Sequence, residues 1–190
     1  MHRVVIVGVG ALGSHLALFG RNWDAKLVLV DFDRVEQKNV ASQLHTRMGV
    51  GRNKAKALEQ LMQGLFGVRV EAIPHRLVED NARAILDGAT VVVDCVDHGP
   101  TRRLVAHVAS DLGVPCLHGA LAADGGYARV MWAPRFDVDD GEAGAATCED
   151  GEHLPFVALV AARMAHVVQR FLTDGTTESI HVRPDGLARV

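Results

Sequence analysis

The feature that most constrains this chain is a glycine-rich turn directly after its first apolar run. Residues 4–7 read Val-Val-Ile-Val and lead into a GxGxxG motif made of Gly8, Gly10 and Gly13. Such a turn takes a buried strand sharply into a helix, so that backbone N–H groups at the helix start face a phosphate. Alone, the motif is a weak indication, because the glycines could equally serve tight packing of a helix on a strand. A nucleotide site therefore needs further polar residues.

An acid at the expected distance strengthens the nucleotide interpretation. Asp31 closes the second apolar run, residues 27–30. It follows the glycines by about 20 residues, the separation at which a carboxylate reaches ribose hydroxyls. On these residues alone an NAD enzyme and an ATP enzyme fit equally.

Three further charged residues favour a triphosphate: Asp33, Lys54 and Asp97. Adenylation needs cations on the phosphates and a carboxylate for magnesium. Lys54 lies near the start of a helical pattern over residues 53–65, where a cation opposes the helix dipole and so favours a phosphate partner over solvent. Asp97 follows the carboxyl end of a central strand, where ligands collect in open α/β sheets. Asp33 could instead cap a turn.

The pattern of the whole chain predicts an α/β fold with a doubly wound, mostly parallel sheet and helices on both faces. A single domain over residues 1–190 is expected from the length and from the 48% hydrophobic content. A turn at Gly125-Gly126 predicts an antiparallel sixth strand, Pro155 opens a long helix to about Leu172, and the tail after the last strand is expected to fray. The expected strands are residues 3–7, 26–31, 69–73, 90–95, 115–119, 127–132 and 179–182.

Composition excludes several classes of protein. The net charge of −3 and the scattered arginines argue against nucleic acid as a partner. The first residues lack the layout of a signal peptide and no apolar stretch approaches membrane-spanning length, so we expect a cytoplasmic protein with no membrane contact. Three widely spaced cysteines exclude a disulfide framework and a four-cysteine zinc site. Cys95 and Cys116 lie in apolar strands and are expected to be inert packing residues.

Taken together, the motifs resemble those of the ThiF/MoeB/HesA family, the bacterial relatives of ubiquitin-activating enzymes. The family pattern runs GxGxxGS, DxDxVxxxNxxRQ, GxxK and DxxDN, with an arginine a few residues later. The resemblance covers nearly the whole chain, including Gly119-Ala120 after a strand. At the family spacings this sequence has Gly8, Gly10, Gly13, Ser14, Asp31, Asp33, Val35, Asn39, Gln43, Gly51, Lys54, Asp94, Asp97 and Arg102.

The resemblance implies a Rossmann-like, ATP-dependent adenylyltransferase that activates the C-terminal glycine of a ubiquitin-like or sulfur-carrier protein. It further implies that the enzyme forms a homodimer or a heterodimer with a relative. Asp31 would hold the ribose, Lys54 the phosphates and Asp97 the magnesium. The glycines, Asp33, Asn39 and Gln43 would complete the ATP site. Asp94 is interpreted as structural, finishing its strand or pairing with Arg102 or Arg103.

Departures from the family pattern keep two alternatives open. Ser42 replaces an arginine that contacts the ATP phosphates in the family, and Arg47 or Arg52 is the candidate substitute. His98 replaces an asparagine, the paired CxxC motifs are absent so that no zinc is expected, and the first strand begins at residue 3, where the family has a preceding arginine-bearing segment. A non-catalytic subunit that pairs with a complete relative is the first alternative. An NAD-dependent oxidoreductase is the second, but it leaves Lys54 and Asp97 unexplained.

Residues 135–153 are rich in acids, glycine and alanine and are expected to form a mobile crossover loop. Cys148 lies in this loop, at a position where the family often has a cysteine that links covalently to the carrier protein. Cys148 is either that nucleophile or an incidental loop cysteine. Its acidic neighbours Glu149, Asp150 and Glu152 disfavour the thiolate in the free protein.

Overall fold

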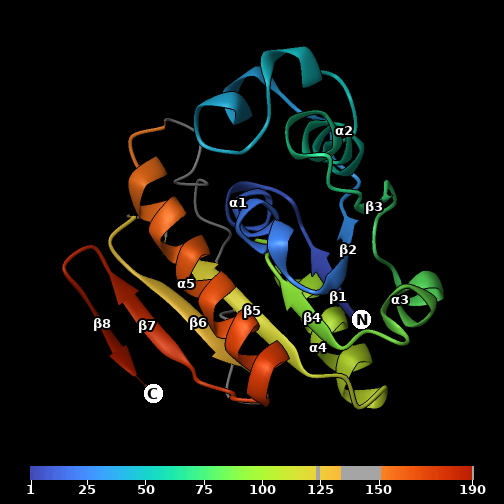
Figure 1. Ribbon diagram of the computed structural model, residues 1–190, viewed down its shortest axis with the longest axis vertical. Coiled ribbons are helices and arrows are strands. Elements are labelled where there is room, and N and C mark those ends of the chain that lie inside the picture. Colours follow the sequence, from blue (N-terminus) through green and yellow to red (C-terminus); the bar gives the residue numbers. More distant parts are fainter. Residues whose placement is uncertain (123–124, 134–150, 190) are drawn as a thin grey trace.

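The central element of the computed structural model is one mixed β-sheet (Figure 1), and the structure describes residues 1–122, 125–133 and 151–189. Within these residues, eight strands lie in the order β3-β2-β1-β4-β5-β6-β7-β8. The strands are β1 His2–Val7, β2 Ala25–Val30, β3 Glu71–Ile73, β4 Val91–Asp94, β5 Cys116–Leu121, β6 Ala128–Trp132, β7 Ile180–Arg183 and β8 Gly186–Arg189. The first five run parallel and the last three antiparallel, which confirms the predicted α/β, Rossmann-like fold.

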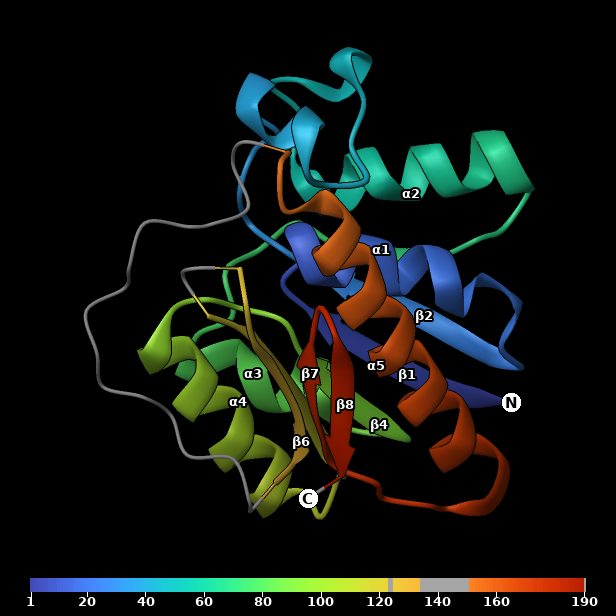
Figure 2. The same cartoon turned by 90° about the vertical axis from the view of Figure 1, so that its left-hand side faces the viewer.

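Helices cover the sheet in two layers because successive strand residues point to opposite faces. In β1, Val4 and Ile6 pack with one layer and Val5 and Val7 with the other. The first layer contains α1 Ala11–Phe19, α2 Lys54–Phe66 and α5 Leu154–Asp174; the second contains α3 Glu79–Leu86 and α4 Gly99–Asp111. Figure 2 shows α5 lying beside α1.

The apolar character of α5 corrects one expectation from the sequence. Its 21 residues contain an 18-residue window with a mean hydropathy of 1.3, which makes it long and apolar enough to cross a membrane by length and composition. The expectation that no stretch approaches that length was therefore wrong. In the fold, one side of α5 is buried against α1 and the sheet, as Val160, Met164 and Val168 show, and core helices reach similar hydropathy for this reason.

The strand order brings three loops together at the carboxyl ends of the central parallel strands. β1 lies between β2 and β4, and Val7 is in register with Val30 on one side and Asp94 on the other. From β1 the chain winds outward through β2 and β3, and then returns to build β4 and β5 on the other side. The loops after β1, β2 and β4 therefore meet at a topological switch point, where open α/β sheets bind their ligands.

The end of the chain differs from the prediction. Instead of fraying, β8 pairs antiparallel with β7 across a turn at Pro184-Asp185. β8 reads Gly-Leu-Ala-Arg and its residues are exposed, so it has neither the β-branched residues nor the buried face that mark a strand in a sequence. The other strands lie within two residues of their predicted ends.

Candidate nucleotide-binding site

Two glycines of the turn after β1 are required by close packing, whereas the third leaves space. Gly8 has a φ of +86°, and a Cβ added there would lie 3.0 Å from the carbonyl oxygen of Cys95. A Cβ at Gly13 would lie 1.9 Å from the Gly8 carbonyl oxygen, so helix and turn touch directly. At Gly10 the nearest atom to an added Cβ is Gln43 Nε2, at 3.9 Å. The turn thus packs on the loop after β4 but stays open at Gly10.

The N-terminus of α1 is suited to an anion. Gly10 is its N-cap residue and has no side chain that could cap the helix, and its first turn contains no acid. The first backbone N–H groups of a helix have no partner within the helix, and the helix dipole adds positive potential there. A phosphate is a ligand that satisfies both.

Asp31 organises the loops around the glycine turn. Its Oδ2 accepts the N–H of Val9 at 2.8 Å, and its Oδ1 accepts the N–H of Asp33 at 2.8 Å. Burial raises the pKa of the Asp31 carboxyl, while the Val9 hydrogen bond and the Lys54 charge oppose that rise. The residue is only 8% exposed. Asp31 therefore couples the loop after β1 to the loop after β2.

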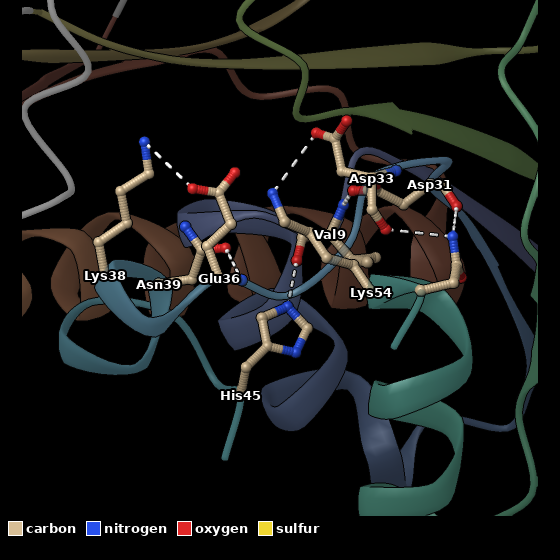
Figure 3. Close-up of polar contacts among 9 residues, drawn as sticks. Val9, Asp31, Asp33, Glu36, Lys38, Asn39, His45 and Lys54 are labelled. Atoms are coloured by element: carbon tan, nitrogen blue, oxygen red, sulfur yellow. Dashed lines mark hydrogen bonds and ion pairs between the residues drawn. The ribbon is translucent and has the colours of Figure 1, made fainter. Parts of the chain in front are cut away.

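Lys54 and Asp33 form the charged pair of the site (Figure 3). Lys54 Nζ lies 3.5 Å from Asp33 Oδ2, with the lysine side chain 11% exposed and the aspartate side chain 49% exposed. The backbone N–H of Lys54 also donates to the Asp33 carbonyl at 2.8 Å. The structure thus brings together two residues that were predicted for one site, a largely buried lysine side chain and a half-exposed aspartate side chain.

Asn53 holds this pair in place. Its Oδ1 caps α2 by accepting the N–H of Lys56 at 3.1 Å, and its Nδ2 donates to the Asp31 carbonyl at 2.8 Å. The asparagine thereby fixes the start of α2 against the end of β2. Sequence reasoning assigned Asn53 no role, although an asparagine directly before a helical pattern is a typical N-cap signal.

Asp97 is exposed in the loop between β4 and α4, and a buried polar cluster supports this loop. Asp94, fully buried, accepts the N–H of Val96 at 3.0 Å, and its other oxygen lies 2.8 Å from His118 Nδ1 and 3.5 Å from Arg102 Nη1. Arg102 Nη2 donates to the carbonyl oxygens of Val96 and Gly119. The structural interpretation of Asp94 and its pairing with Arg102 are confirmed, whereas the sequence analysis missed His118.

The remaining predicted residues lie in and after the short helix η2 Gln37–Ala41. Asn39 is 5% exposed, and its Oδ1 accepts the N–H of Glu36 at 2.8 Å, so it caps this turn. Ser42 Oγ and Gln43 Oε1 are buried and have no hydrogen-bond partner among the described residues. Arg52 donates to Gln60 Oε1 at 2.5 Å along α2. This contact engages the Arg52 guanidinium with α2.

Thiols and metal ligands give no second site in the described part of the chain. Burial raises the pKa of the Cys95 and Cys116 thiols, which keeps both protonated at neutral pH, as expected for packing residues. Residues 1–122, 125–133 and 151–189 contain no group of three or more His, Cys, Asp or Glu that could hold a metal ion. Cys148 and residues 135–150 of the predicted acidic loop, 135–153, lie outside the described residues.

Comparison with known proteins agrees with this geometry. The model of the ThiF family matches residues 1–182. The chain belongs to the ThiF family. It is 37% identical over 135 residues to the SAMP-activating enzyme E1 of Haloferax volcanii, a match over 68% of this chain and 49% of that protein. It is 39% identical over 137 residues to the sulfur carrier protein adenylyltransferase of Thermus thermophilus, covering 69% of this chain and 49% of that one.

Solved structures of other proteins share this α/β fold. The crystal structure of PaaA matches with a TM-score of 0.78 at 16% identity, covering all of this chain and 63% of that one. The structure of E. coli MccB with ATP matches with a TM-score of 0.77 at 17% identity, covering 100% of this chain and 63% of that one. This ThiF-family chain spans about half the length of the two curated relatives described above. Neither of these relatives is named as an oxidoreductase or as a non-catalytic subunit.

Proposed function

We propose that this ThiF-family protein binds ATP with magnesium and adenylates the C-terminal glycine carboxylate of a ubiquitin-like or sulfur-carrier protein. The observation that carries the proposal is the pairing of Lys54 with Asp33 beside the uncapped N-terminus of α1, at the switch point of the sheet. Relatives named as an adenylyltransferase of a sulfur carrier and as a SAMP-activating enzyme support this reaction class and this kind of partner.

The phosphates of ATP would lie between the glycine turn and Lys54. Backbone N–H groups at Gly10 and in the first turn of α1 would face the phosphates, and the Lys54 ammonium would supply a full positive charge. Such fixed groups lower the barrier to phosphoryl-type transfer by stabilising charge that grows on the phosphate oxygens. Lys54 would exchange its Asp33 partner, at least in part, for a phosphate.

Asp33 is better placed than Asp31 to accept hydrogen bonds from the ribose hydroxyls. Each Asp31 oxygen already accepts a backbone N–H and the residue is nearly covered, whereas half of the Asp33 side chain is exposed. Asp31 would then act indirectly, by holding the loops after β1 and β2 in position. This proposal refines the assignment that the family resemblance suggested.

Asp97 fits the magnesium requirement. Magnesium in such sites is held by one or two carboxylates together with substrate phosphates and water, and Asp97 is an exposed carboxylate on the loop beside the glycine turn. The ion would neutralise charge on the phosphates and the departing pyrophosphate. The contacts among Asp94, Arg102 and Val96 would keep the Asp97 loop in position.

The acyl substrate has a candidate path beside Asp97. A cavity of about 280 Å³ is lined by residues that follow Gly119 in the chain. Arg102 Nη2 donates to the carbonyl oxygen of Gly119 and also to that of Val96, which belongs to the Asp97 loop. A cavity of this size would admit a narrow peptide tail, and its arginine would favour a carboxylate. The lining residues are Ala120, Leu121, Ala122, Tyr127 and Arg129. The carboxylate of the tail would attack the α-phosphorus of ATP, the bond to pyrophosphate would break, and an acyl-adenylate would form.

Cys148 is the candidate nucleophile for a step after adenylation. If Cys148 acts, its thiolate attacks the acyl carbon and AMP leaves, which yields a thioester. Cys148→Ala would then leave adenylate formation unchanged and abolish a thiol-sensitive adduct, as measured by mass spectrometry.

We further propose a homodimer, or a heterodimer with a relative, with an interface on the order of 2,000 Å². A monomer by light scattering at high concentration would contradict the dimer.

The reaction is tested by ATP–pyrophosphate exchange with a small carrier protein that ends in Gly-Gly. We expect exchange that depends on magnesium and on the carrier, and no exchange when the terminal glycine carboxylate of the carrier is amidated. Exchange that proceeds equally with the amidated carrier would contradict activation of the terminal carboxylate. Absence of exchange, with ATP bound, would favour the non-catalytic subunit.

A further inference from the structure

His45 lies directly beneath the glycine turn. Its segment is tied to α1, because the N–H of Leu44 donates to Ser14 Oγ at 2.9 Å. His45 is 6% exposed, and its Nε2 lies 3.0 Å from the carbonyl oxygen of Val9 (Figure 3). A buried histidine, absent from the predicted site residues, therefore contacts the backbone of the predicted phosphate-binding turn.

The contact identifies the tautomer of the imidazole. The Val9 carbonyl oxygen can only accept a hydrogen bond, so His45 Nε2 carries the proton. Nδ1 is buried and has no partner among the described residues, which fits a neutral ring. Burial, together with the Lys54 and His15 charges, lowers the pKa of His45 to about 4 against the effect of its Val9 hydrogen bond. His45 is thus a neutral donor at physiological pH.

Val9 is held from both ends of its backbone. Asp31 Oδ2 accepts its N–H at 2.8 Å, and His45 binds its carbonyl oxygen. In a trans peptide the C=O and the following N–H point in opposite directions. Figure 3 shows His45 on the side of Val9 opposite to Asp33 and the Lys54 ammonium. The Gly10 N–H is consequently directed to the side on which Lys54 lies.

The Gly10 N–H is also available for a ligand. None of the backbone and side-chain hydrogen bonds of the described residues uses it, and Gly10 precedes a helix without a side-chain cap. An isolated turn could rotate the Val9–Gly10 peptide, which would aim the carbonyl oxygen, in place of the N–H, at an anion. The His45 hydrogen bond opposes that rotation, because it would leave the buried imidazole without its acceptor.

We propose that His45 is a positioning residue for nucleotide phosphates: its Nε2–H fixes the Val9–Gly10 peptide so that the Gly10 N–H donates to a phosphate oxygen. The inference rests on the proposed nucleotide binding and adds a residue that acts through the backbone of the turn. His45 does not touch the nucleotide, so its removal affects ligands with phosphates and spares those without.

The test compares ATP with adenosine, which lacks phosphates, by titration of the wild type and three variants. His45→Phe keeps a planar ring and removes the donor, whereas His45→Gln keeps an N–H at similar reach. His15→Phe is the matched control: His15 is 8% exposed and its Nδ1 contacts the Ala11 carbonyl oxygen at 2.8 Å, inside α1. We expect His45→Phe to bind ATP about tenfold more weakly with adenosine unchanged, since a hydrogen bond to a charged group is lost. His45→Gln and His15→Phe should both bind ATP like the wild type.

The outcomes separate the two proposals. A wild type that binds no ATP overturns the proposed function. A wild type that binds ATP, with His45→Phe weakening both ligands equally or neither, overturns only the role of His45. If His45→Phe does not fold, NMR of the wild type decides: the Gly10 amide proton should move downfield with ATP but not with adenosine, and the His45 ring should be protonated at Nε2. An unmoved Gly10 or the Nδ1-protonated tautomer contradicts the inference.

Discussion

Lys54 and Asp33 approach within 3.5 Å although 21 residues separate them in the sequence. The link is built by the backbone, because the N–H of Lys54 donates to the Asp33 carbonyl and Asn53 binds the end of β2. A cation at the first position of a helix opposes the helix dipole, so its carboxylate partner offsets a local cost. The pair is thus a preformed polar site in which an anionic ligand can compete with Asp33 for Lys54.

Lys54→Met should weaken ATP binding by about 10- to 100-fold, since a charge-assisted contact to phosphate is lost. Lys56→Met is the matched control, because Lys56 lies in the same helix and pairs with Glu59 at 3.0 Å on the exposed surface. Isothermal calorimetry of both variants with ATP and magnesium measures the difference. Equal affinities of the two variants would show that Lys54 does not contact the phosphates.

Asp97→Ala should reduce ATP–pyrophosphate exchange by about 100-fold or more and leave stability within about 0.5 kcal/mol, because it removes an exposed carboxylate from a loop. Exchange assays at increasing magnesium, with thermal unfolding of the same samples, measure both quantities. Full exchange activity would exclude Asp97 as a magnesium ligand, and a large loss of stability would make it a structural residue.

Asn53→Ala should lower the free energy of unfolding by about 1–2 kcal/mol and also weaken ATP binding, because it removes a helix cap that positions Lys54. Asn81→Ala is the control. Asn81 likewise accepts a backbone N–H, that of Val78 at 2.9 Å, and donates to the Arg76 carbonyl at 2.9 Å, but at the start of α3. Denaturant unfolding and ATP titration should show similar destabilisation of both variants and weaker binding in Asn53→Ala alone.

His45 should make stability depend on pH in a defined window. Its pKa is about 4 in the folded protein and 6.5 in the unfolded reference, so between these values only the unfolded chain binds the proton. The free energy of unfolding should fall as pH is lowered from 6.5 to 4, by about 3 kcal/mol from this residue. His45→Phe should remove that dependence. If the free energies of unfolding of the wild type and of His45→Phe change with pH in the same way between pH 6.5 and 4, the shifted pKa of His45 is contradicted.

The sequence predicted the sheet, and it supplied the candidate site residues, because both follow from local patterns. The strand ends, the glycine turn and the charged residues after β2 and β4 each have a short-range signal. The contacts that organise the site are long-range: His45 with Val9, separated by 36 residues, and His118 with Asp94, separated by 24. No periodicity marks such pairs. β8 was missed because its residues lack strand propensity and pair only at an edge.

The central claim is that the switch-point site binds a triphosphate nucleotide with magnesium, and calorimetric titration with ATP–magnesium and with NAD tests it most directly. The Lys54 ammonium and the open N-terminus of α1 lie together at the site, and Asp97 follows the neighbouring strand β4. The account predicts one ATP bound per chain, affinity that drops without magnesium, and no measurable heat with NAD. Saturable binding of NAD with ATP inert would contradict it.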